Sequence, residues 1–150
     1  MTSSVRAYRN SAIEGASHID ILLACYDALA EDIRTAGSAA SKGDLPARCR
    51  YSQRALLLIG HLESWASVLD DSELVASLTS FYQYLRDQIL RLQPCGNRDK
   101  FVALALVVCE TRAVWQRKQA EALLRAGATS ESRYQAGERD DATPHFLASA

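Results

Sequence analysis

The fold class follows from one stretch, Ser17-His-Ile-Asp-Ile-Leu-Leu-Ala-Cys-Tyr-Asp-Ala-Leu-Ala-Glu-Asp-Ile33. Its apolar residues recur at three- and four-residue spacing, which places them on one face of an amphipathic helix. Ser17 is a candidate N-cap, and Asp20 in the first turn favours the helix start. We therefore predict a helix over residues 17–36, ended by the flexible link Gly37–Gly43.

Three further helices are expected downstream, over residues 44–68, 70–93 and 97–127, each with an apolar stripe at helical spacing. No stretch alternates apolar and polar residues as a strand does. The predicted helix starts are Asp44 with Pro46, Asp70 or Asp71, and Asn97 or Asp99. The predicted helix ends are marked by Pro94 with Gly96 and by Gly127.

Four long helices joined by short links predict an all-α fold, an antiparallel four-helix bundle. The helices differ in charge. Residues 17–36 hold one basic and four acidic residues, whereas residues 98–126 hold six basic and three acidic residues. Net charges of −3 and +3 favour packing of the first helix beside the fourth.

Three regions are expected along the 150 residues. Residues 1–16 are mixed in polarity and predict a separate N-terminal arm that carries Tyr8 and Ile13. Residues 17–127 form the bundle. Residues 128–150 are mostly small or charged and predict a mobile tail.

Composition argues against several function classes. A net charge of −1 gives little electrostatic attraction to nucleic acid. The longest apolar run, Phe101–Cys109, is too short to cross a membrane, and the chain starts without a secretory signal, so a cytoplasmic location is expected. The four cysteines are too far apart in sequence to form a zinc-type pair. No metal or cofactor is expected.

Catalytic motifs are also missing, so an enzyme is not expected. The sequence holds no Glu-x-x-His pair, no His-Glu-x-x-His, no glycine-rich phosphate loop and no Gly-x-Ser-x-Gly elbow. One alternative rests on His61, at the flank of the second predicted helix, because histidine phosphotransfer modules are four-helix bundles with one exposed histidine. Ser64 and Trp65 stand where such modules usually have lysine and glycine.

The most informative feature is surplus apolar surface. A helix at the surface of a bundle needs one apolar stripe, yet three of the four predicted helices carry additional apolar side chains. Each buried Leu or Val contributes about 1.5–3 kcal/mol, so exposed copies invite association. The surplus could be covered by the N-terminal arm, by a second copy of the chain, or by a partner's amphipathic helix. The residues concerned are Ile21, Leu56, Leu57, Val102, Leu106, Val107 and Val114.

Several segments, taken in order, resemble the flagellar secretion chaperone family (FliS). They match an Ala-Tyr arm, a leucine run leading to Tyr-Asp-Gly, the end of the second helix, a Leu-x-x-Leu-Tyr-x-Tyr pattern and an Ala-Trp in the last helix. Ala28 stands where the family has glycine, Cys25 where it has leucine, and Phe81 where it has leucine. The matching segments are Ala7–Ile13, Ile21–Leu29, Leu58–Leu62, Val68–Asp70, Leu78–Leu85 and Trp115.

The resemblance implies a cytoplasmic chaperone that binds the disordered C-terminal segment of flagellin and prevents polymerisation before export. It also implies that the arm around Tyr8 covers part of the binding groove until the client arrives, and that export-apparatus components are further partners. The surplus apolar residues are then the expected client contacts, with Tyr8 and Ile13 as a displaceable lid. A plain helical dimerisation module remains an alternative.

The family-signature residues in this chain are Tyr8, Tyr26, Asp27, Tyr82 and Trp115. Tyr26 lies on the main apolar face of the first predicted helix, so we expect it in the core. Asp27 lies outside that face and is expected to be a solvated charge or the partner of an arginine.

Overall fold

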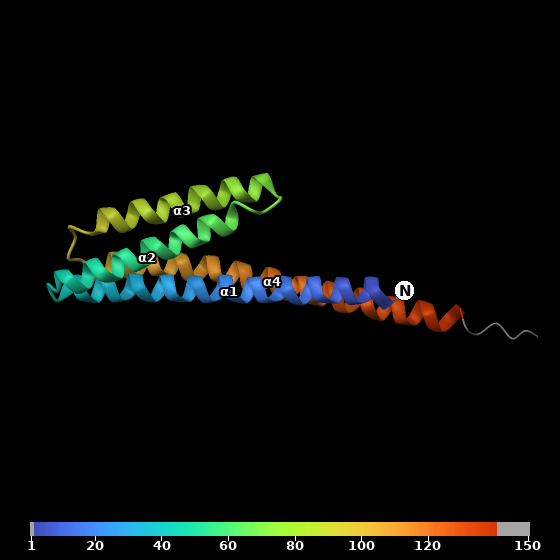
Figure 1. The fold of residues 1–150 in the computed structure, drawn as a ribbon. Helices are drawn as coiled ribbons and strands as arrows, with labels where there is room; N and C mark the ends of the chain where they lie inside the picture. Colours follow the sequence, from blue (N-terminus) through green and yellow to red (C-terminus); the bar gives the residue numbers. More distant parts are fainter. Residues whose placement is uncertain (1, 141–150) are drawn as a thin grey trace, which may run out of the picture. The chain divides into compact units, whose positions relative to one another are not determined.

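The computed structural model describes the backbone of residues 2–140 and the side chains of residues 18–136. Within this range the chain forms four helices and no strand (Figure 1). The prediction of an all-α four-helix fold is confirmed. The helices are α1 (Thr2–Ser41), α2 (Leu45–Ala66), α3 (Ser72–Leu92) and α4 (Arg98–Asp140).

Three of the predicted helix starts are confirmed by their capping contacts. At the start of α4, the Asn97 side-chain oxygen accepts a hydrogen bond from the Asp99 amide at 3.0 Å. The Asp44 carboxylate accepts a hydrogen bond from the Ala47 amide at 3.1 Å, with Pro46 in the first turn of α2. The Asp71 carboxylate accepts from the amides of Glu73 and Leu74, each at 3.1 Å. Each cap satisfies amide groups that have no partner inside the helix.

The outer ends of α1 and α4 differ from the prediction. α1 begins at Thr2, so Ser17 is not an N-cap, and residues 2–16 continue the helix backbone instead of forming a separate arm. α4 passes through Gly127 and ends at Asp140. No proline interrupts either segment, and a glycine inside a helix costs only about 1 kcal/mol relative to alanine.

The predicted break at Gly37 is also wrong, because α1 continues to Ser41. Gly37 is buried against Phe101 of α4, and a Cβ at this position would lie 2.5 Å from the Phe101 Cβ. Close approach of the two helices, not a turn, explains this glycine. The turn comes later, at Gly43, which has a φ of 71° that favours glycine.

The chain divides into two units, Met1–Trp115 and Gln116–Ala150, which are described separately. In the first unit α2 lies between α1 and α3 (Figure 1). All four helices contribute to its buried core, whose largest members are Tyr26, Tyr82, Phe101, Leu29, Ile33, Ile59, Leu62, Leu85, Ile89 and Val108.

The predicted pairing of the first and fourth helices is confirmed. Arg112 of α4 forms an ion pair with Asp27 of α1, with 2.6 Å between Nε and Oδ1. Arg34 of α1 donates a hydrogen bond from Nη2 to the Cys109 Sγ at 3.1 Å. Asp27 is therefore the partner of an arginine, one of its two expected roles.

In the second unit, the part of α4 after Trp115 exposes Leu123, Leu124 and Tyr134. The backbone of residues 128–140, the first part of the predicted tail, is helical, and residues 141–150 lie outside the described residues. Across residues 2–140, no helix combines the length and the apolarity that a membrane span requires.

Candidate functional site

The structure sorts the predicted surplus residues by exposure. Four are exposed: Ile21 (61%), Leu57 (67%), Leu106 (53%) and Val114 (41%). Leu56, Val102 and Val107 are half-buried, and Leu56 packs against the core. The side chains of Tyr8 and Ile13 lie outside the described residues. Of the seven predicted client contacts whose side chains are described, four are therefore exposed.

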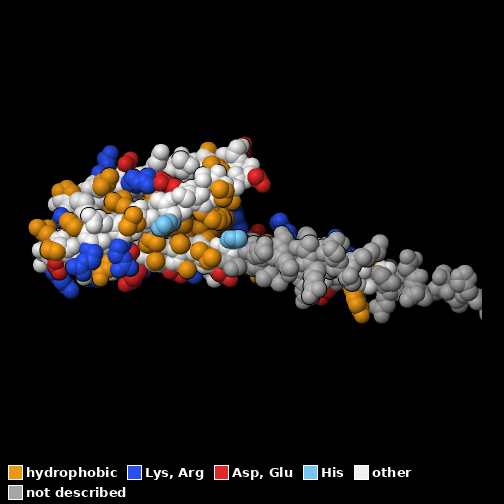
Figure 2. All heavy atoms as spheres, viewed as in Figure 1, with side chains coloured by type: hydrophobic (Ala, Val, Ile, Leu, Met, Phe, Trp, Pro, Cys, Tyr) orange, Lys and Arg blue, Asp and Glu red, His pale blue; other side chains and the backbone are white. Residues whose placement is uncertain are grey.

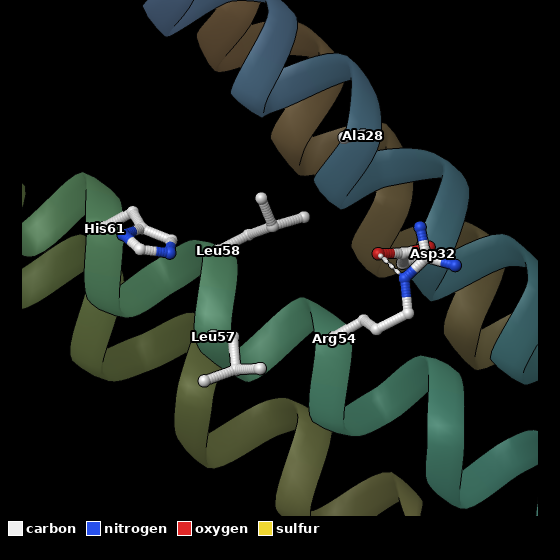
Figure 3. A pocket seen from close by; sticks show the side chains of 6 residues that line it. All are labelled: Ala28, Asp32, Arg54, Leu57, Leu58 and His61. Carbon is white, nitrogen blue, oxygen red and sulfur yellow. Dashed lines mark ion pairs between the residues drawn. The ribbon is translucent and has the colours of Figure 1, made fainter.

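Leu57 belongs to a hollow of about 220 Å³ between α1 and α2. Figure 3 shows Leu58 pointing toward α1 across this hollow. We call it the α1–α2 groove, defined by Ala28, Asp32, Arg54, Leu57, Leu58 and His61. Ile21 lies seven residues before Ala28 and so shares the same side of α1.

Hydrophobic side chains gather on the face where α1 and α2 run side by side, around the histidines (Figure 2). On α1 this face holds Ile21, Ala24 and Ala28, and the two alanines allow close approach by another chain. The α2 side spans two helical turns, from Arg54 to His61. The result is an open apolar strip with polar groups near both ends.

The exposed residues of α4 form a different patch. α4 meets α1 through Cys109 and Arg112. Val107 and Val114 are seven residues apart and share a side of α4 that is turned away from Cys109. Val102 and Leu106 lie closer to the Cys109 side, but no described α4 residue is among those that line the α1–α2 groove.

Three of the family-signature residues meet inside the first unit. The hydroxyls of Tyr26 and Tyr82 are 2.8 Å apart and fully buried, and Tyr26 also hydrogen-bonds Trp115. Trp115 in turn packs edge-on against Trp65, with 5.6 Å between ring centroids. Burial raises the pKa of both tyrosine phenols, which stay neutral. The core position expected for Tyr26 is confirmed.

Asp32 was not among the predicted site residues. Its side chain is buried, with only 3% of the residue exposed, although it borders the α1–α2 groove. Burial raises the pKa of its carboxyl group, the nearby Arg54 acts to lower it, and Glu31 adds a smaller upward effect. The available signal was positional, since Asp32 follows Ala28 by four residues and extends the Ile21–Ala28 stripe by one turn.

His61, the candidate for phosphotransfer, is exposed and borders the same groove beside Leu57 and Leu58. Within the described part of the chain, no group of three or more His, Cys, Asp or Glu side chains is placed to hold a metal ion. The groove therefore offers apolar contacts and a few hydrogen-bonding groups, an arrangement suited to binding a peptide.

Comparison with known proteins adds a family to this geometry. The family model described as "Flagellar protein FliS" matches residues 1–122. No curated protein matches the chain significantly. The matched range takes in the α1–α2 groove, the buried tyrosine pair and the exposed α4 residues Leu106 and Val114.

Proposed function

The chain belongs to the FliS family of flagellar proteins, which implies a flagellar export chaperone for flagellin, and from this premise we propose how it holds its client. It binds the C-terminal helical segment of flagellin along the α1–α2 groove. By covering the apolar face that this segment would use in the filament, it prevents polymerisation before export.

The observation that carries the proposal is the exposed apolar strip of the groove. Ile21 and Leu57 leave more than half of their surface open on one continuous face. Burial of such side chains contributes about 1.5–3 kcal/mol each, so a client helix gains substantially by covering them. That gain is needed, because ordering a disordered segment costs several kcal/mol.

The second exposed patch, on α4, gives a long client segment another place to bind. Leu106 and Val114 are exposed there, and Val107 is half-buried on the same side as Val114. Val102, also half-buried, lies seven residues before Cys109 and so is on the side of α4 that meets α1. A segment that contacts both the groove and this patch gains avidity over one that contacts a single patch. A lid role for Tyr8 and Ile13 requires residues 2–16 to leave α1, because a continuous helix does not cover its own flank.

The test is a paired substitution of one groove residue and one exposed residue about two turns before Ala28 on α1, Leu57→Asp with Ile21→Asp. Titration calorimetry with the C-terminal flagellin segment is expected to show at least a roughly tenfold loss of affinity, because two apolar contacts become charged. Leu90→Asp is the matched control, since Leu90 is an exposed leucine on α3, away from the groove.

The same variants distinguish a flagellin-binding groove from a groove that binds a second copy of the chain. If the double variant folds, as judged by circular dichroism, and still binds flagellin with unchanged affinity, the groove is not the client site. If light scattering instead shows that the wild-type chain is a stable dimer without flagellin affinity and the double variant is a monomer, the groove is a self-association surface and the proposal is wrong.

A further inference from the structure

The α1–α2 groove contains a buried carboxylate with unused hydrogen-bonding capacity. The Asp32 side chain is 5% exposed, and its Oδ2 makes no hydrogen bond to any described residue. The nearest cation is Arg54, whose Nε lies 3.4 Å from this oxygen (Figure 3). The Arg54 guanidinium also lies over the Tyr51 ring, 5.4 Å from its centroid.

This arrangement is costly for the chain alone. A buried acceptor without a hydrogen bond loses its water, and the ion pair with Arg54 compensates for this only in part. An apolar residue of similar size is often equally stable or more stable at such a position. The packing of the bundle therefore does not explain an aspartate at this point, whereas a polar group brought by a bound partner does.

We infer that Asp32 and Arg54 together form a polar subsite of the groove that binds a side-chain carboxamide, asparagine or glutamine, of the client segment. Asp32 Oδ2 is buried, so the Arg54 side chain, which is 58% exposed, has to shift when the client binds. The carboxamide N–H then donates to Asp32 Oδ2, and its carbonyl oxygen accepts from the Arg54 guanidinium. This inference rests on the proposed function and adds a specificity-determining contact to it.

The charges of the subsite favour a carboxamide over other side chains. A client lysine or arginine is attracted to Asp32 but repelled by Arg54, and a client carboxylate is attracted to Arg54 but repelled by Asp32. A neutral group with both a donor and an acceptor satisfies both residues, and the carboxamide has these groups on separate atoms. A hydroxyl combines both roles on one oxygen and reaches less far into the hollow.

The walls of the groove also define the client sequence next to the carboxamide. Leu57 and Leu58 follow Arg54 by about one helical turn on α2 and are the apolar part of the hollow. A helical client that places a carboxamide at the subsite covers these leucines with a residue three or four positions away. The expected client feature is therefore an asparagine or glutamine one turn from a large apolar residue.

The central experiment replaces Asp32 with leucine. For Asp32→Leu we expect a roughly 10- to 100-fold loss of affinity for the C-terminal flagellin segment, because a hydrogen bond to a charged group is lost. We expect a higher Tm at the same time, because a buried unsatisfied carboxylate is removed. Glu31→Leu is the matched control: it makes the same charge change one residue away, at an exposed position, and is expected to leave affinity unchanged.

Flagellin segments in which each asparagine and glutamine is replaced in turn by leucine complete the test. One replacement is expected to weaken binding to the wild-type chain at least tenfold and to have little effect on binding to Asp32→Leu, which is the sign of a direct pair. If only a serine or threonine replacement shows this coupling, the carboxamide assignment is wrong.

The two proposals fail in different ways. If Asp32→Leu binds as tightly as the wild type while the Ile21 and Leu57 double variant has lost affinity, the polar subsite is wrong and the client groove stands. If Asp32→Leu does not fold, Asp32→Asn repeats the measurement with the same side-chain shape. A smaller loss in the same direction supports the subsite, and no loss overturns it.

Discussion

Tyr26 and Tyr82 place two phenol hydroxyls at the centre of an otherwise apolar core. Each is fully buried, and each hydroxyl serves as the other's hydrogen-bond partner at 2.8 Å. Because buried hydroxyls are expensive unless paired, the two tyrosines have to be present together. Their contact joins α1 to α3, two helices that are not neighbours in sequence. These signature residues therefore have a structural role and do not face the proposed client groove.

We predict that removing one hydroxyl of this tyrosine pair lowers the stability of the fold but leaves client binding unchanged. Tyr82→Phe removes one hydroxyl and leaves that of Tyr26 with one fewer partner, so we expect the free energy of unfolding to fall by about 1–2 kcal/mol. Urea denaturation measures this change. Affinity for the flagellin segment should stay within about twofold at temperatures where the variant is folded; a large loss of affinity without loss of stability would place Tyr82 in the client site.

Asp32 pairs with Arg54, but burial affects its pKa more than this pair does. Asp32 therefore makes stability depend on pH in the direction opposite to that of a carboxylate whose pKa is lowered by a salt bridge. Burial raises its pKa above the ordinary value of 3.8, so the folded chain holds this proton more tightly than the unfolded chain. The stabilising effect of protonation is complete below pH 3.8 and is lost as pH rises through the folded-state pKa. The quantity to compare is the free energy of unfolding of the wild type minus that of Asp32→Asn. This difference should fall as the pH increases from 3.8 through the folded-state pKa of Asp32.

Urea denaturation of both proteins at several pH values from 4 upward measures that difference. Glu31 lies beside Asp32 on α1, and Arg54 and His61 border the same groove from α2. All three are present in both proteins, so the difference between the two curves isolates Asp32. A difference that is constant over the range, or that rises with pH, would contradict a raised pKa.

At the scale of the helix, the local signals in the sequence predicted starts better than ends. Asp44 and Asp71 cap α2 and α3 because capping depends only on a side chain and amides two or three residues away. Ser17 was predicted as a helix start and Gly37 as a helix end, but α1 continues through both residues. At Gly37 the reason is tertiary, since Phe101 of α4 occupies the space that a side chain would need.

The same limit applies to the candidate site. Periodicity gives the direction in which a side chain points, but a neighbouring helix decides whether that direction is covered. Leu56 and Glu63 are seven residues apart on one side of α2, and Glu63 binds Arg86 of α3 through two hydrogen bonds of 2.7 Å. Leu56 therefore faces α3 and is half-buried, whereas its neighbour Leu57 remains exposed.

At the scale of the whole molecule, fold and proposed function belong to the first unit. Among the residues whose side chains are described, the core extends no further than Trp115, and the family match ends at residue 122. Charge balance predicted the pairing of α1 with α4, and the Asp27–Arg112 ion pair is part of it. The surplus apolar surface was predicted as one site, but the structure divides it into the α1–α2 groove and the α4 patch.

Deletion of residues 123–150 tests whether the first unit is sufficient. No residue beyond Trp115 is part of the described core, so the shortened chain should unfold within about 2 °C of the full-length Tm. Calorimetry against the C-terminal flagellin segment should give the same affinity within about threefold, because the groove is retained entire. A drop in Tm of 10 °C or more would mean that the second unit stabilises the bundle. An unchanged Tm with a tenfold loss of affinity would instead make exposed residues such as Leu123 and Leu124 part of the client surface.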